Sequence, residues 1–277
     1  MKTTKQVTKQ ISKILKVCTL SVTLMSTILM STSASAEGSY VESEPYNTSK
    51  INGYSYSFTS GIVRNDINRP AIKAFAYVHN KASGSGNVPI GYMGGQAVLY
   101  TSGGQLHGAS DMKYNDEEVW GFHVYSPVSE STGKYYSQSR AEFYNGDDYD
   151  YFTGKKSPIM TINLNKGVLV DVEEADLQEL MLEEEYDVNS KGETYGSLLL
   201  ENIIGEEPDL ISAVGTDGVE GYVRADDLTP VTSIKEALEQ TIENGEVRTI
   251  PLYDVDGETV IGEFKLETKF EYITDTE

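Results

Sequence analysis

Aromatic and β-branched side chains alternate with small polar side chains along much of the chain before Met160. Tyr54, Tyr56 and Phe58 alternate with Ser and Thr, and residues 71–79 form an unbroken β-compatible run. A period of two residues places alternate side chains on opposite faces of a strand. The pattern therefore predicts a mainly β protein built from antiparallel sheets, and we find no helical period of useful length before Met160.

The remaining strands of this part are expected at regular intervals. Residues 96–100 lead into a Gly103-Gly104 turn, residues 105–107 follow it, and residues 119–125 and 135–144 complete the set. Strands of this number and length suit a two-sheet sandwich. We therefore expect a tyrosine-rich β-sandwich over residues 51–157, preceded by a flexible N-terminal segment at residues 37–50.

The first 36 residues have the three parts of an export signal. Five lysines and no acidic residue precede an apolar stretch from Val17 to Met30, and Ala34-Ser35-Ala36 provides a small-residue cleavage site. The apolar stretch is shorter than the roughly 20 residues that a membrane-spanning helix needs. The sequence thus predicts a cleaved signal peptide at residues 1–36, a secreted, extracellular mature chain that starts at Glu37, and no membrane span.

The only cysteine of the chain, Cys18, lies inside this signal. A mature chain without a thiol has no disulfide, no thiolate metal ligand and no cysteine nucleophile. Lipid attachment at Cys18 is not expected, because Lys16 interrupts the small apolar triplet that should precede it.

Acidic residues are concentrated in the second half of the mature chain. Residues 37–160 carry 13 acidic and 10 basic side chains, whereas residues 161–277 carry 30 acidic and 7 basic ones. Such a step indicates a domain boundary, which we place at residues 155–158. We therefore expect an acidic α+β domain over residues 158–277. Nucleic acid is excluded as a partner, because phosphate binding needs clustered basic residues.

Four elements are expected in this acidic part. Residues 173–186 have the pattern of an acidic helix, and residues 209–223 form a hairpin around Gly215-Thr-Asp-Gly218. Ser233-Ile-Lys-Glu236 is a capping box that begins a helix ending near Gly245. A second hairpin, residues 248–266, turns at Asp256-Gly257.

Residues that carry chemistry are few. A catalytic triad needs a base, and His79, His107 and His123 are the only histidines; no Gly-x-Ser-x-Gly motif accompanies them. Two or three of them could converge on a metal, although strand histidines are more often structural. We predict no catalytic residue, no cofactor and no metal site.

Carboxylates leave two further alternatives open. Asp254-Val-Asp256-Gly257 and Asn145–Asp150 resemble parts of calcium loops, but a turn explains both. Glu117, Glu118 and Glu142 are the acidic residues near aromatic side chains that a glycosidase would use. An extracellular hydrolase is accordingly an alternative that we do not favour.

Aromatic side chains indicate a binding function instead. Flat rings on a rigid sheet are suited to stack against sugars, although sheet tyrosines also serve as ordinary packing. The candidate platform consists of Trp120, Tyr125, Tyr135, Tyr136, Tyr144, Tyr149 and Tyr151. We predict a secreted, non-enzymatic binding or interaction protein, whose partner is a cell-wall glycan bound by the sandwich or another extracellular protein.

Two resemblances accompany these patterns. Asp217–Leu228, with its Gly221-Tyr-Val223 strand, resembles the closing strands of bacterial SH3 modules. Gly94-Gly-Gln-Ala97, Tyr144-Asn-Gly146, residues 193–228 and residues 250–262 are similar to exported proteins of unknown function from Gram-positive spore-forming bacteria. This likeness implies an extracellular location and no particular activity.

Overall fold

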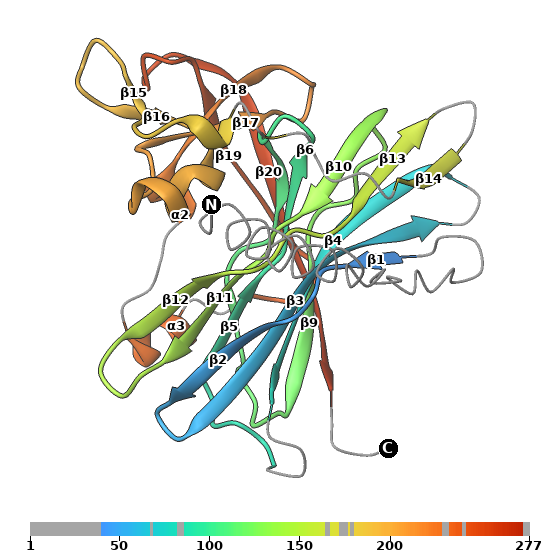
Figure 1. Ribbon diagram of the computed structural model, residues 1–277, viewed down its shortest axis with the longest axis vertical. Helices are drawn as coiled ribbons and strands as arrows, with labels where there is room; N and C mark the ends of the chain where they lie inside the picture. Colours follow the sequence, from blue (N-terminus) through green and yellow to red (C-terminus); the bar gives the residue numbers. More distant parts are fainter. Residues whose placement is uncertain are drawn as a thin grey trace, which may run out of the picture. The chain divides into compact units, whose positions relative to one another are not determined.

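The computed structural model describes residues 40–66, 69–81, 86–163, 167–171, 177, 180–228, 233–239 and 242–273 (Figure 1). These residues are mainly β-strand, which confirms that the chain is a mainly β protein. The predicted signal peptide and its cleavage site lie outside the described residues. None of the helices in the described part of the chain is long and apolar enough to cross a membrane.

Twelve strands are described before residue 158. They are β1 (Tyr40–Glu42), β2 (Tyr46–Ile51), β3 (Tyr54–Asp66), β4 (Ala71–Asn80), β5 (Met93–Gln96), β6 (Val98–Thr101), β7 (Leu106–Ala109), β8 (Lys113–Tyr114), β9 (Gly121–Tyr125), β10 (Gly133–Ser137), β11 (Arg140–Tyr144) and β12 (Tyr149–Thr153). The described part of the segment 37–50, for which we predicted flexibility, contains β1 and most of β2. Both pair with the long strand β3.

The strands form two sheets. The larger one has the order β1-β3-β4-β9-β20-β19-β18-β17-β7-β6-β10-β13-β14, and the smaller one has the order β12-β11-β5-β8. In Figure 1, β5, β11 and β12 lie together on one side of the strands β2, β3, β4 and β9. A stack of Tyr56 on Phe143, with ring centroids 4.0 Å apart, joins β3 to β11 across the two sheets.

Two segments that we predicted as single strands are each divided. The chain passes from β5 to β6 at Ala97, and from β10 to β11 at Gln138 and Ser139. β5 pairs with β11 in the smaller sheet, whereas β6 pairs with β10 in the larger one. Two neighbouring chain segments therefore bend together from one sheet into the other, as strands do at the corners of packed sheets.

At these bends, backbone N–H groups have no partner in a sheet and donate instead to the hydroxyls of buried serines. The backbone N–H of Ala97 donates to Ser110 Oγ at 3.0 Å, and the N–H of Ser139 donates to Ser60 Oγ at 2.8 Å. All four residues are fully buried. An unpaired N–H at such a place would cost free energy, so the serines allow the corner to be buried.

The chain after residue 158 contains strands and short helices. The strands are β13 (Ile159–Asn163), β14 (Gly167–Asp171), β15 (Asp187–Val188), β16 (Thr194–Gly196), β17 (Leu210–Val214), β18 (Glu220–Arg224), β19 (Glu246–Tyr253) and β20 (Val260–Ile273). The helices are α2 (Glu201–Ile204), α3 (Ile234–Glu239) and 3-10 turns at Leu180–Leu182, Leu198–Leu200 and Ala225–Leu228.

Both predicted hairpins of this part are confirmed. β17 and β18 pair antiparallel around Gly215–Gly218, and β19 and β20 pair antiparallel around Asp256-Gly257. The predicted cap of α3 is also present, because Ser233 Oγ accepts a hydrogen bond from the N–H of Glu236 at 3.2 Å. Of the acidic helix expected at residues 173–186, the described part contains a 3-10 turn at Leu180–Leu182; residues 173–176 and 178–179 lie outside the described residues.

Strands from both sides of the predicted boundary share the larger sheet. β20 pairs with β19 over its first part and with β9 over its last part, and it also meets β7. Figure 1 shows β20 running from the group of β17, β18 and β19 to the group of β3, β4 and β9. The division at residues 155–158 into a β-sandwich and an acidic α+β domain stays a prediction.

Candidate functional site

Five aromatic side chains on β4, β9 and the residue before β9 form a continuous stack, which we call the ring stack. Its order is Trp120, His79, Tyr77, His123 and Tyr125. Successive ring centroids lie 4.6, 4.7, 4.5 and 6.1 Å apart, and the planes of successive rings differ by 12–28°. All five side chains are only half-buried. The ring stack is thus an ordered aromatic surface that water can still reach.

The register of β4 against β9 builds the ring stack. Tyr77 lies opposite His123, and His79 lies opposite Gly121. The alternate residues Ala76 and Val78 are fully buried, so the odd-numbered side chains of β4 project from the opposite face of the sheet. Glycine is needed at 121, because a Cβ there would lie 2.6 Å from the Cβ of His79.

Lys73 closes one end of the ring stack. Its ammonium group lies 3.7 Å from the centroid of the Tyr125 ring, which is a cation–π contact. Burial lowers the pKa of Lys73, while the nearby Glu271 carboxylate opposes this shift.

A groove runs between β1 and the ring stack, and we call it the β1 groove. Its volume is about 340 Å³. Val63 and Phe75 belong to its apolar part, Tyr77, His123 and Tyr125 belong to the ring stack, and Tyr40 and Glu42 come from β1. Tyr40 is 47% exposed, and it is the one exposed aromatic residue in the part of the chain that the structure describes.

The ring stack carries no charge at neutral pH. Burial lowers the pKa of His79 and of His123, so both imidazoles are neutral at pH 7. Burial also raises the pKa of Tyr77, and it raises that of Tyr125 to about 12. The rings consequently offer hydroxyl and ring N–H groups for hydrogen bonds, together with apolar carbon surface.

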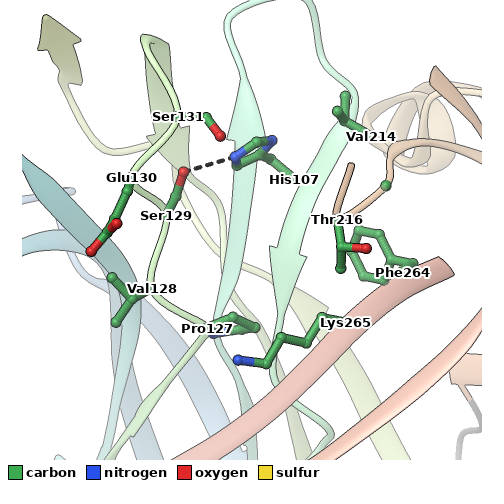
Figure 2. A pocket seen from close by; sticks show the side chains of 11 residues that line it. His107, Pro127, Val128, Ser129, Glu130, Ser131, Val214, Thr216, Phe264 and Lys265 are labelled. Carbon is green, nitrogen blue, oxygen red and sulfur yellow. Dashed lines mark hydrogen bonds between the residues drawn. The ribbon is translucent and has the colours of Figure 1, made fainter. Parts of the chain in front are cut away.

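A second hollow, which we call the His107 cavity, has a volume of about 360 Å³ (Figure 2). Nε2 of His107 lies 2.8 Å from Ser129 Oγ. Nδ1 of His107 is buried, and it has no hydrogen-bond partner among the described residues. Burial lowers the pKa of His107 to about 4, so this imidazole is also neutral at pH 7.

The three histidines do not converge on one point. His79 and His123 lie on either side of Tyr77 in the ring stack, whereas His107 lies on β7 in the other hollow. Within the described residues, no three His, Cys, Asp or Glu side chains lie close enough together to hold one metal ion.

Glu142 is 5% exposed and hydrogen-bonded by the Tyr114 hydroxyl, so it does not face an open cleft. Burial raises its pKa, and the Tyr114 hydrogen bond opposes that shift. Glu117 and Glu118 are both exposed on the surface. Of these three residues, Glu142 is the one buried against tyrosines, with Tyr114 and Tyr149 beside it.

In each of the two acidic loops, polar side chains form hydrogen bonds within their own turn. Asn145 Oδ1 accepts the N–H groups of Asp147 and Asp148 at 3.0 Å, and its amide donates to Asp150 at 2.8 Å. Asp256 Oδ1 likewise accepts the N–H groups of Glu258 and Thr259 at 2.8 Å.

The predicted tyrosine platform is only partly exposed as a surface. Trp120 and Tyr125 belong to the ring stack, whereas Tyr135 and Tyr136 are 3% and 0% exposed and pack in the interior. Tyr144 and Tyr149 contact each other in the smaller sheet, and Tyr151 packs on Arg140. Sequence reasoning missed Tyr77, His79 and His123 as surface rings. Their i, i+2 spacing was a signal, but the pairing of β4 with β9 was needed to join them.

Comparisons of the chain with family models, with curated proteins and with solved structures give no match.

Proposed function

We propose that this protein is a secreted, non-enzymatic binding protein and that the β1 groove holds a neutral glycan of the cell surface. The ring stack is the observation that carries the proposal. Five half-buried rings on the solvent side of one sheet give a rigid, ordered aromatic surface on which a sugar ring can stack.

The chemistry of the β1 groove suits a sugar better than a charged ligand. A pyranose ring combines an apolar face of C–H groups with hydroxyls at its edge. Phe75 and Val63 offer apolar surface, Tyr40 offers an open ring, and the Glu42 carboxylate can accept hydroxyl hydrogen bonds. The strongly acidic chain disfavours polyanionic partners.

The finer architecture belongs to the same proposal. We expect residues 51–157 to act as the tyrosine-rich β-sandwich that carries the ring stack, and residues 158–277 to act as an acidic α+β domain beside it. The packing of Tyr56 on Phe143 between the two sheets supports a sandwich. The extracellular location rests on the signal sequence and on the likeness to exported proteins.

A hydrolase is the contrasting function, and the pair of His107 and Ser129 is the observation that favours it. A serine nucleophile needs a histidine that accepts its proton and is then stabilised as imidazolium. His107 is a weak base at neutral pH, and its buried Nδ1 meets no carboxylate among the described residues. This pair therefore supports ligand contact better than acyl transfer.

Binding of the mature chain to purified cell wall and to a panel of neutral polysaccharides tests the proposal. Tyr40→Ala should weaken binding about tenfold, because an exposed ring that stacks on a ligand contributes up to about 1.4 kcal/mol. Tyr144→Ala, which removes a tyrosine of the smaller sheet, should leave binding unchanged. Equal binding by both variants, or no binding of any neutral polysaccharide, would refute the proposed site.

A further inference from the structure

The His107 cavity is built from four parts of the chain and is distinct from the β1 groove. His107 comes from β7, Ser129 from the segment between β9 and β10, Thr216 from the turn between β17 and β18, and Phe264 and Lys265 from β20 (Figure 2). Strands from both sides of the predicted domain boundary therefore form its walls. Its volume of about 360 Å³ lies in the range of small-ligand sites.

Lys265 brings an ammonium group to one side of the cavity. Lys265 Nζ lies 2.7 Å from Glu267, but Lys269 Nζ contacts the same carboxylate at 2.5 Å. Two ammonium groups therefore share one carboxylate, so Glu267 does not belong to Lys265 alone. Glu130 also lines the cavity, and in Figure 2 its side chain is directed away from His107.

Ser129 is positioned to donate a hydrogen bond into the cavity. When Nε2 of His107 carries the proton, it donates to Ser129 Oγ across 2.8 Å, and the Ser129 hydroxyl proton can then go to the neighbouring Tyr135 hydroxyl or to a ligand oxygen. The Ser131 side chain lies beside this pair in Figure 2. A ligand oxygen that approaches Lys265 from inside the cavity would thus meet a hydroxyl donor as well as a cation.

The remaining walls are apolar. Pro127, Val128 and Val214 supply carbon surface around the polar groups, whereas Phe264 is 1% exposed and belongs to the core behind them. A bare inorganic anion would leave this surface in contact with water, whereas a short hydrocarbon chain would cover it. We propose that the His107 cavity binds a small organic carboxylate with a short apolar chain, its carboxylate between Lys265 and Ser129 and its chain against Val214.

The test titrates the mature protein with butyrate, using butyramide as an uncharged probe of the same shape and inorganic phosphate as an anion without an apolar part. Butyrate should bind saturably, and at least about tenfold more tightly than either other probe, because a hydrogen bond to a charged group contributes about 1.5 kcal/mol or more. Binding of phosphate or butyramide as tight as that of butyrate, or no saturable binding of butyrate, would overturn the assignment.

Two matched variants locate the site. Lys265→Met should weaken butyrate binding about tenfold, whereas Lys269→Met, which removes the other partner of Glu267, should change it less than about twofold. In the wild type at pH 7, saturating butyrate should also shift the His107 ring signals in proton NMR, because the bound anion lies beside the imidazole. Equal loss in both lysine variants, or unchanged His107 signals at saturation, would place butyrate outside this cavity.

Discussion

At the scale of single residues, polar side chains take over hydrogen bonds where the sheets are interrupted. Ser60 lies on β3, yet its hydroxyl accepts the N–H of Ser139 at the bend between β10 and β11. Ser110 does the same for Ala97 at the bend between β5 and β6. These serines look like ordinary small strand residues in the sequence. Their role depends on partners far away in the chain, so the sequence alone could not reveal it.

Ser60→Ala should lower the free energy of unfolding by about 1–3 kcal/mol, because it leaves the buried N–H of Ser139 without an acceptor. Ser55→Ala on the same strand is the matched control, since Ser55 is half-buried, and it should cost under about 0.5 kcal/mol. Urea unfolding measures both values. Equal stability of the two variants would show that the corner does not need this hydroxyl.

Glu142 makes stability depend on pH. Burial raises its pKa in the folded state, so the folded chain binds more protons than the unfolded chain between the ordinary glutamate pKa and the raised one. Its contribution to stability is therefore present at low pH and is lost as the pH rises through the raised pKa.

Glu142→Gln should consequently stabilise the protein by roughly 1 kcal/mol at pH 7, because the neutral amide avoids the cost of burying a charge and still accepts the Tyr114 hydrogen bond. The gain should shrink toward zero as the pH falls below about 4.5. Glu118→Gln, at an exposed position, is the control. A gain that is constant with pH in urea unfolding would contradict this explanation.

At the scale of elements, structure that forms between neighbouring residues was predictable from the sequence, whereas strand pairing between distant segments was not. The hairpins around Gly215–Gly218 and Asp256-Gly257 were predictable, because the turn and both strands are contiguous in the sequence. The capped start of α3 was predictable for the same reason. The division of residues 135–144 between two sheets and the joining of Tyr77 to His123 both depend on strand pairing between distant segments.

Gly121→Ala should disturb the ring stack, because the new Cβ would lie 2.6 Å from His79 Cβ and 2.7 Å from the carbonyl oxygen of Val78. We expect a loss of about 1–3 kcal/mol in the free energy of unfolding and a changed Trp120 emission spectrum in the folded state. Gly103→Ala is the control, since its nearest contact would be Thr101 Oγ1 at 3.7 Å. An unchanged Trp120 spectrum in Gly121→Ala would mean that the stack tolerates the methyl group.

At the scale of the whole molecule, β20 connects the two parts that differ so strongly in charge. It pairs with β19 in the acidic part and with β9 beside the ring stack. The acidic composition predicted a boundary at residues 155–158, but composition carries no information about which strands pair across it.

We therefore expect the mature chain to unfold in one cooperative transition, with equal calorimetric and van't Hoff enthalpies. Two transitions in scanning calorimetry would instead support two independently folding domains divided near residue 157. Scanning calorimetry of residues 37–157 tests the contribution of this pairing, because the fragment lacks the β20 strand that pairs with β9.

The most direct test of the binding site uses Trp120, the only tryptophan of the chain and one end of the ring stack. Trp120 fluorescence of the mature protein is titrated with a neutral cell-wall polysaccharide, for the wild type and for Tyr40→Ala. A glycan in the β1 groove should give a saturable change in the wild type, with a midpoint about tenfold higher in Tyr40→Ala. Saturable binding that leaves Trp120 fluorescence unchanged, or equal midpoints in the two proteins, would contradict the account.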